Sequence, residues 1–446
     1  MNRYDLVIQN AQIITYDRKL QRVIKELADV AVKNQKIVEI SNKIDTDSEK
    51  KLDAKGLTLL PGVIDSQVHF REPGLTHKED IESGTRAAIL GGITSIFEMP
   101  NTNPNTTTKA AFEEKMQIAK VKANCHYSFF IGASNENVAQ VAELEKLQHS
   151  PGLKIFLGAS FGSLLVEDDI IFEQIMKNGS RRLTIHSEDE ARLKQRKHIA
   201  IEAGHPRVHH IWRDEESALI STRKSVALAE KYNRPVHILH VSSSEEMSFL
   251  REHKKIASVE ILPQFLTLSA PECYERLGTL AQQNPPIRDQ RHLEKLWQAV
   301  LNGTVDIIGS DHAPHTLEEK NKPYPESPSG FPGVQTLLPI MLNHVHQQKF
   351  SIEKLTELVT ENPRKLFQVK NKGRIEIGYD ADFTLIDLKM QKTITNKWIA
   401  SKCGYTPFDG MKVTGWPTHT ILKGQIVMQD DQVISAHQGE AIEFSK

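Results

Sequence analysis

The chain has 446 residues, of which 39% are hydrophobic and 25% are charged, and its formal net charge at pH 7 is −1. This composition is typical of a globular protein and offers no excess of positive charge for binding nucleic acid or an anionic membrane. Its three cysteines (Cys125, Cys273 and Cys403) are far apart, so neither a disulfide framework nor a thiolate zinc site is expected.

The first sixty residues predict short strands. Asp5–Ile14, Ala28–Ile40 and Leu57–Leu60 are strand-like, and charged, turn-forming segments separate them. Polar and apolar residues alternate at the N-terminus, and no later run approaches the length of a membrane span. We therefore expect a cytoplasmic protein without a signal peptide or membrane segment.

After Pro61 the pattern changes to strands that alternate with helices. Amphipathic stretches such as Ala218–Tyr232 and Leu293–Leu301 have apolar residues at helical spacing. The strand-like segments between them are Val63–His69, Thr94–Met99, Tyr127–Ile131, Leu153–Leu157, Leu183–His186, Val236–His240, Ser258–Leu262 and Val305–Ile308. Eight such strand–helix units over about 310 residues predict an α/β fold, a (β/α)8 TIM barrel that spans residues 61–372.

Strand patterns return near the C-terminus. Asp382–Asp387 and Thr418–Met428 are strand-like, with Gly378 and Gly424 as turn residues. We expect residues 1–60 and 373–446 to pair into a small composite β-sandwich domain beside the barrel.

Candidate metal ligands lie at the ends of four predicted strands. His69, His186 and His240 each end a strand, and Asp311 follows another closely. One histidine near a strand end is more often structural than a ligand. Four such residues at the C-terminal ends of four barrel strands would instead converge on one barrel mouth. Imidazole and carboxylate groups without nearby thiolates suit zinc or another borderline divalent ion.

Lys154 lies within the apolar run GLKIFLG. Burial there would disfavour its ammonium form and lower its pKa. The alternative is that its stem lies along the barrel rim while the charge reaches solvent. The residues alone leave both possibilities open.

Three motifs in chain order carry a resemblance to a known family. They are PGVIDSQVHFREPG (Pro61–Gly74), FEMPNTNP (Phe97–Pro104) and GSDHAPHT (Gly309–Thr316). Together they resemble the dihydroorotases of the amidohydrolase superfamily, and the resemblance spans essentially the whole chain. It implies a hydrolase that interconverts (S)-dihydroorotate and N-carbamoyl-L-aspartate in de novo pyrimidine biosynthesis.

The resemblance also implies a metal centre. Lys154 would be carbamylated by carbon dioxide and would bridge the ions of a site that holds one or two Zn²⁺. His186 and His240 would hold one ion, and His69 and Asp311 would hold the other. Asp311 would also act as the general base and deliver the proton to the departing ring nitrogen.

Substrate recognition is implied by the same resemblance. Arg71 shares a strand face with His69, and its planar fork of donors suits the carboxylate of dihydroorotate. The further expected contacts are Asn101 and His315 to the carboxylate, and Asn284, Ser329 and Gly330 to the ring amides.

Gln67 departs from the family pattern, which usually has DxHxH where this chain has Asp65-Ser66-Gln67-Val68-His69. Its neutral carbonyl oxygen is a weaker zinc ligand than an imidazole nitrogen. The ion held by His69 and Asp311 could therefore be bound loosely or be absent, or the site could hold no ion.

Two alternatives stay open. One is a related cyclic amidohydrolase, such as an allantoinase or a dihydropyrimidinase. The other is a non-catalytic dihydroorotase-like subunit that associates with aspartate transcarbamoylase. Because Lys154, Arg71 and the other site residues are retained, an active dihydroorotase is favoured. A homodimer is expected from the resemblance alone.

Overall fold

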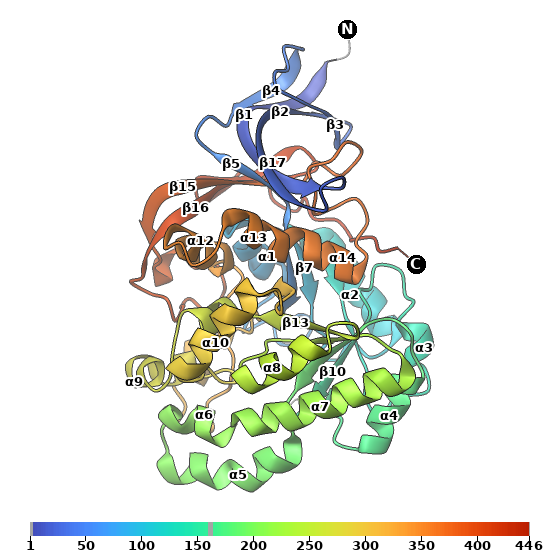
Figure 1. Ribbon diagram of the computed structural model, residues 1–446, viewed down its shortest axis with the longest axis vertical. Helices are drawn as coiled ribbons and strands as arrows, with labels where there is room; N and C mark the ends of the chain where they lie inside the picture. The colour runs from blue at the N-terminus through green and yellow to red at the C-terminus, as the bar shows by residue number, and fades with distance from the viewer. Residues whose placement is uncertain (1–2, 159–163, 446) are drawn as a thin grey trace.

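Strands from both ends of the chain form one nine-stranded sheet in the computed structural model, which describes residues 3–158 and 164–445 (Figure 1). The order across the sheet is β18 (Gln432–Val433), β17 (Gln425–Gln429), β16 (Lys412–Leu422), β15 (Phe383–Thr393), β5 (Thr58–Pro61), β1 (Tyr4–Asp17), β2 (Arg22–Lys33) and β3 (Lys36–Ser41), and β4 (Ser48–Asp53) pairs with β1. The antiparallel pairing of β5 with β15 joins the two ends.

Two predicted strands are wrong because each is a hairpin. Ala28–Ile40 divides into β2 and β3 at Asn34 and Gln35, whose φ angles are 49° and 67°. Thr418–Met428 divides between β16 and β17 at Gly424, where φ is 82°. Positive φ angles at the centre of a tight turn match the twist of the flanking strands.

Both ends of the chain contribute to one apolar core within this sheet. Ile8, Val30 and Leu59 from the N-terminal strands pack in the same cluster as Phe383 and Leu385, and all five are fully buried. Neither end could bury this surface alone, because each supplies only part of the cluster. The division of the chain at residues 60 and 372 stays a prediction.

The central strands are all parallel and form a closed ring. They are β6 (Val63–Val68), β7 (Ile93–Glu98), β8 (His126–Phe129), β9 (Ile131–Gly132), β10 (Leu153–Leu157), β11 (Leu183–Ser187), β12 (Val236–Ile238), β13 (Ala257–Ile261) and β14 (Ile307–Ile308). Only Phe130 separates β8 from β9, so these nine strands occupy eight positions. A parallel bridge between Val68 and His312 closes the ring between the first and last strands. The predicted α/β fold class is confirmed.

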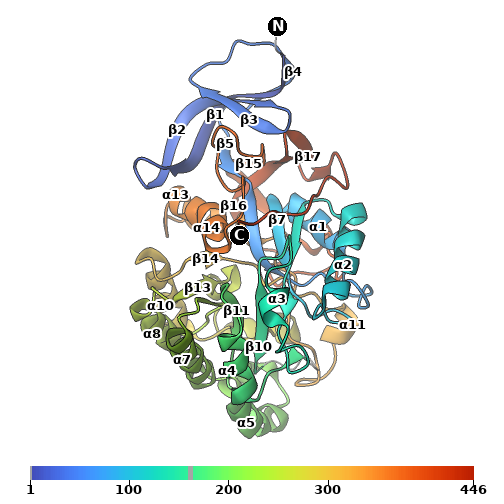
Figure 2. The same cartoon turned by 90° about the vertical axis from the view of Figure 1, so that its right-hand side faces the viewer.

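Helices follow most of the central strands and cover the outside of the ring (Figures 1 and 2). The α-helices are α1 (Ile81–Leu90), α2 (Lys109–Lys122), α3 (Val141–Leu144), α4 (Asp169–Lys177), α5 (Glu190–Ala203), α6 (His209–Trp212), α7 (Glu215–Tyr232), α8 (Ser244–Glu252), α9 (Glu272–Leu277), α10 (Gln290–Leu301), α11 (Leu317–Lys320), α12 (Leu337–His346), α13 (Ile352–Thr356) and α14 (Asn362–Phe367).

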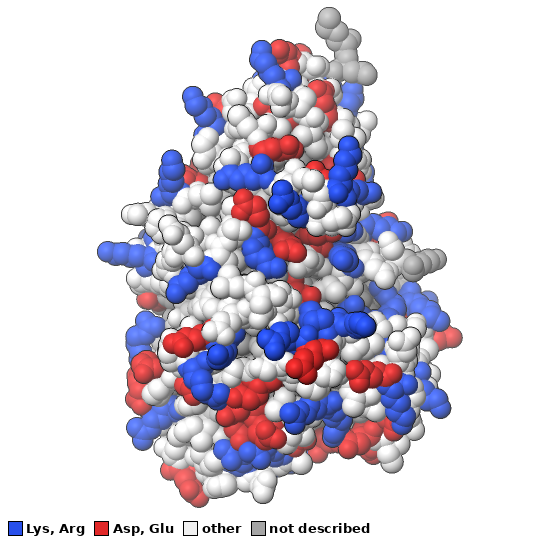
Figure 3. Space-filling view, viewed as in Figure 1, with Lys and Arg blue, Asp and Glu red and all other residues white. Residues whose placement is uncertain are grey.

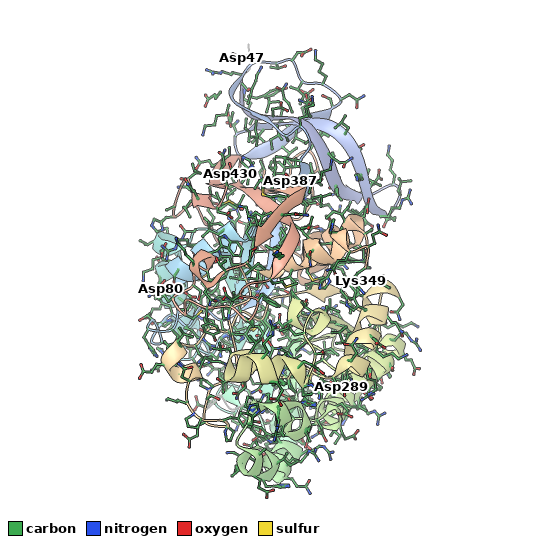
Figure 4. All side chains as sticks on the ribbon, turned by 90° about the vertical axis from the view of Figure 1, so that its left-hand side faces the viewer. Asp47, Asp80, Asp289, Lys349, Asp387 and Asp430 are labelled. Carbon is green, nitrogen blue, oxygen red and sulfur yellow. The ribbon has the colours of Figure 1, made fainter. Side chains whose placement is uncertain are left out.

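Both amphipathic helices expected from the sequence are present, and each begins three residues earlier than predicted. The extra turns follow capping aspartates: Asp214 accepts from Ser217 N, and Asp289, labelled in Figure 4, accepts from Arg291 N. Such caps satisfy amide groups that lack a partner within the helix.

Basic and acidic side chains are interspersed on the face that Figure 3 shows, so neither sign of charge forms a large patch there. Among the described residues, no helix is both long enough and apolar enough to cross a membrane.

Candidate active site

A cavity of ≈ 30 Å³ lies where the predicted site residues meet. Its lining consists of Gln67, His69, Arg71, Lys154, Phe156, His186, His240, Asn284, Asp311, Ala313, Ser329 and Gly330. Every residue expected from the sequence is therefore at this cavity except Asn101 and His315, which contact residues that line it. Most of the lining side chains come from segments that end or follow barrel strands, as in enzymes built on this fold, whereas Lys154 is the second residue of β10.

His69 and Asp311 meet at the seam where the ring closes. The amide of His69 donates to the carbonyl of His312 at 2.7 Å, and His69 Nε2 lies 3.2 Å from Asp311 Oδ1. The other ring nitrogen, Nδ1, lies 2.5 Å from Asn101 Oδ1. A proton on Nδ1 bound by Asn101 directs the lone pair of Nε2 toward Asp311.

Gln67 also contacts the seam, through the nitrogen of its side-chain amide. Gln67 Nε2 donates to Asp311 Oδ1 at 2.9 Å. Its carbonyl oxygen is buried and has no hydrogen-bond partner among the described residues. The side chain that replaces the usual histidine is therefore a hydrogen-bond donor to Asp311.

His186 and His240 form the second pair, with His186 Nδ1 3.0 Å from His240 Nε2. Glu188 Oε2 lies 3.0 Å from His186 Nε2 and also accepts from Arg213 at 2.6 Å. Burial alone would raise the pKa of Glu188, but Arg213 and His186 outweigh it and bring the pKa to about 2. The charged carboxylate holds the proton of His186 on Nε2, so Nδ1 presents its lone pair toward His240.

Lys154 is fully buried, and its Nζ has no hydrogen-bond partner among the described residues. The Nζ lies 4.5 Å from the centre of the Phe156 ring. Burial lowers the pKa of Lys154 to about 7, although the charges of Asp311 and Glu260 oppose that shift. At neutral pH, a large share of the molecules therefore have an uncharged amine at Lys154.

Three of the polar site residues have left-handed backbone conformations that favour glycine. The φ angles are 64° at Arg71, 38° at His240 and 48° at Asp311. Such angles cost about 1–3 kcal/mol in a residue with a side chain and cluster at functional sites. Each follows a barrel strand, so the turn changes the direction in which the side chain points.

Arg71 is buried, and its guanidinium is held in place by the loop after β14. Its Nε donates to the carbonyl of Pro314 at 3.2 Å, and one terminal nitrogen lies 3.4 Å from His315 Nε2. Burial lowers the pKa of Arg71 to about 10, so the group stays charged at neutral pH. His315 thus contacts Arg71 without lining the cavity, and Asn101 contacts His69 in the same way.

Gly330 allows its loop to approach the barrel. Its φ is 127°, and a Cβ at this position would lie 2.5 Å from the carbonyl oxygen of Ala313. A second contact fixes the loop, because the Gly330 amide donates to Gln282 O at 2.8 Å. Ser329 and Gly330 are thereby held on the same side of the cavity as the segment that carries Asn284.

Sequence reasoning missed four residues that line the cavity or fix His186. Phe156 and Ala313 line it, and Glu188 and Arg213 fix His186. Glu188 could have been suspected, because it lies two residues after a candidate ligand. Arg213 is 25 residues further along the chain, and no local pattern connects the two.

The chemistry of the cavity fits a metal centre that requires a further ligand. Among the described residues, no three His, Cys, Asp or Glu side chains are grouped as ligands of one ion. They form two pairs, and Lys154 lines the same cavity. Three buried atoms there lack a hydrogen-bond partner in the described parts of the chain: Gln67 Oε1, Lys154 Nζ and His240 Nδ1. Buried polar atoms are normally paired, so these atoms could be satisfied by a group bound in the cavity.

Sequence comparisons show which known proteins this chain resembles. Residues 58–427 match the sequence model of the amidohydrolase family. The chain is 32% identical over 435 residues to the dihydroorotase of Methanothermobacter thermautotrophicus, an alignment that covers 97% of this chain and 96% of the relative. It is 35% identical over 416 residues to the dihydroorotase of Pyrococcus abyssi, with 93% and 94% covered.

Solved structures give the same fold. The L-hydantoinase (dihydropyrimidinase) of Arthrobacter aurescens superposes with a TM-score of 0.93 at 27% identity and covers 99% of this chain and 100% of that chain. The dihydropyrimidinase of Brevibacillus agri gives a TM-score of 0.90 at 25% identity, with 99% of each chain covered. From the family match and the full-length relatives, the chain belongs to the amidohydrolase family, as a member of its dihydroorotase group.

Proposed function

We propose that this protein is a metal-dependent dihydroorotase that opens and closes the ring of dihydroorotate by reversible hydrolysis to N-carbamoyl-L-aspartate. The observation that carries the proposal is one buried cavity lined by His69, Lys154, His186, His240 and Asp311 together with Arg71. Imidazole and carboxylate groups suit a hydrolytic metal, and a buried guanidinium suits an anionic substrate.

The metal would be zinc, one or two ions, held by the two side-chain pairs. His186 and His240 would hold one ion, and His69 and Asp311 the other. Carbon dioxide would react with the uncharged amine of Lys154 to form a carbamate. The carbamate would add a carboxylate ligand to both pairs of side chains. When bound, zinc would polarise the ring amide carbonyl and make an attacking water more acidic.

Gln67 bears on the number of ions. Its Nε2 donates to Asp311 Oδ1, so the amide supports the carboxylate while its oxygen stays available. An amide oxygen binds zinc more weakly than imidazole does. The ion held by His69 and Asp311 would therefore be the weaker of the two.

Asp311 would move the proton. Gln67 Nε2 and His69 Nε2 both contact its Oδ1, at 2.9 and 3.2 Å. This arrangement leaves Oδ2 to take a proton from the attacking water and return it to the departing ring nitrogen. The left-handed turn at Asp311 supports this role, because it aims the carboxylate into the cavity.

Arg71 would bind the substrate carboxylate. Its guanidinium is oriented by Pro314 O and remains charged despite burial. Asn101 uses its Oδ1 for His69, and its buried Nδ2 has no partner among the described residues, so that nitrogen is a second donor for an anion. His315 would support the carboxylate site through its contact with Arg71.

The likeness to hydantoinases makes a hydantoin-type cyclic amide the second candidate substrate. Arg71 discriminates the two, because a neutral ring would leave its charge buried without an anion. The test is turnover by purified protein with its metal content measured. Hydrolysis of dihydroorotate with little hydrolysis of hydantoin supports the proposal. No turnover of dihydroorotate by fully metal-loaded protein would refute it.

A further inference from the structure

His209 lies behind the cavity and has no part in the roles described above. It belongs to α6 and is fully buried, with its ring packed edge-on against Trp212, Tyr274 and Tyr324. It does not line the cavity, but it contacts Asn284, which does.

The contacts of His209 fix the position of its ring proton. Its Nε2 lies 3.0 Å from the backbone carbonyl oxygen of Gln283, and a carbonyl oxygen can only accept a hydrogen bond. Nε2 therefore carries the proton. Its Nδ1 lies 3.1 Å from the Tyr324 hydroxyl, which can donate to it. Burial lowers the pKa of His209 to about 3, in agreement with a neutral ring that has one proton.

The protonated Nε2 in turn fixes the amide of Asn284. The Asn284 atom that lies 3.0 Å from Nε2 has to be an acceptor, so it is Oδ1. The opposite orientation of the amide would bring two N–H donors together at that distance. The other amide atom, Nδ2, then points away from His209 and belongs to a residue that lines the cavity.

We propose that His209 is a positioning residue that turns Asn284 so that its Nδ2 donates to the ureido carbonyl of the substrate. This inference rests on the proposed dihydroorotase function. The ring has two carbonyl groups, and the one that is cleaved has to face Asp311 and the metal ligands, so the ureido carbonyl is the acceptor left for Asn284. The site would thereby discriminate against rings that lack an acceptor at that position, because they would leave Nδ2 unpaired.

Two ligands separate this role from a structural one. N-carbamoyl-L-aspartate has the ureido carbonyl and two carboxylates, whereas succinate has only the carboxylates. His209→Phe keeps an aromatic ring but removes the donor that holds Asn284. We expect roughly a 3- to 10-fold rise in KM and in the dissociation constant of N-carbamoyl-L-aspartate. The change in kcat should be smaller, and the inhibition constant of succinate should stay the same.

His209→Gln is the matched variant, since its amide can donate to Asn284 and accept from Tyr324. It should recover most of the lost affinity for N-carbamoyl-L-aspartate. Equal weakening of both ligands in His209→Phe would show a purely structural role and overturn the inference, as would wild-type affinity for both. If wild-type protein fails to turn over dihydroorotate, the proposed function fails instead.

Nitrogen NMR of the histidine rings tests the geometry without reference to activity. The His209 signals, assigned by their loss in His209→Gln, should show protonated Nε2 and unprotonated Nδ1 from pH 5 to pH 8. A ring that is protonated at Nδ1, or that gains a second proton in this range, would overturn the inference even if His209→Phe does not fold.

Discussion

The proposed carbamylation of Lys154 leads to a prediction about pH that follows from burial. An ordinary lysine has a pKa of about 10.4, so at pH 7 only about one amine in 2,500 is uncharged. Burial lowers the pKa of Lys154 to about 7, so that about half of the molecules have the uncharged amine. Only the uncharged amine reacts with carbon dioxide. The reactive fraction at pH 7 is therefore about a thousandfold larger than for an exposed lysine.

The expected result concerns protein from which metal and carbon dioxide have been removed. At a constant concentration of dissolved carbon dioxide, the rate of uptake should rise with pH to about 7 and then level off. Activity regained on adding zinc should follow the same curve, and native mass spectrometry should find one carbon dioxide per chain. A rate that continues to rise about tenfold per pH unit to pH 9 would refute the reasoning.

Lys154→Met should take up no carbon dioxide and show no activity at any pH. Lys320 is an internal control, because burial also lowers its pKa to about 7. Its Nζ, however, is bound by three backbone carbonyls, those of Gln282, Pro328 and Gly330, at 3.0, 2.8 and 3.0 Å. If Lys320 took up carbon dioxide as readily as Lys154, the lack of a hydrogen-bond partner at Lys154 Nζ would not explain why carbon dioxide reacts there.

Three further predictions concern metal binding, substrate choice and stability. Gln67→His should lower the dissociation constant of the more weakly bound zinc ion at least about tenfold, or 1.4 kcal/mol, because imidazole replaces an amide; an unchanged metal titration would show that position 67 is not a ligand. Arg71→Met should lower kcat/KM for dihydroorotate by roughly 10- to 150-fold through loss of charged hydrogen bonds, without lowering any activity toward hydantoin. Lys115→Met should lower the free energy of unfolding in urea by about 3–5 kcal/mol, because it leaves the buried carboxylate of Glu98 without its only ion pair in the described residues. The double variant with Glu98→Leu should recover most of that loss, and failure to recover would mean that packing dominates.

Much of the fold was predictable because strands of a closed parallel ring have a simple signature. Short apolar segments are followed by polar residues at their C-terminal ends, and this order located His69, His186, His240 and Asp311. The ends of the chain were harder to predict. The strand predicted over residues 28–40 contains a tight turn in which Asn34 and Gln35 interrupt an otherwise apolar alternation.

The supporting contacts of the site were not predictable from local patterns. Arg213 reaches Glu188 across 25 residues, and Tyr324 reaches His209 across 115. These contacts depend on which loops meet above the ring, and no periodicity in the sequence encodes that meeting. The unusual backbone angle at Arg71 is also set by the loop that it joins.

Because the seam joins the first and last strands of the ring, the candidate site is complete only after the whole ring has folded. His69 and Asp311 meet across 242 residues, so neither has its partner until the last strand docks beside the first. Closing so long a loop costs entropy and belongs to the slow steps of folding. An ion held by both side chains would bind only the closed ring and would stabilise it by mass action. A partly folded barrel would therefore have no hydrolytic centre with which to attack amides, and metal uptake would report that the ring has closed.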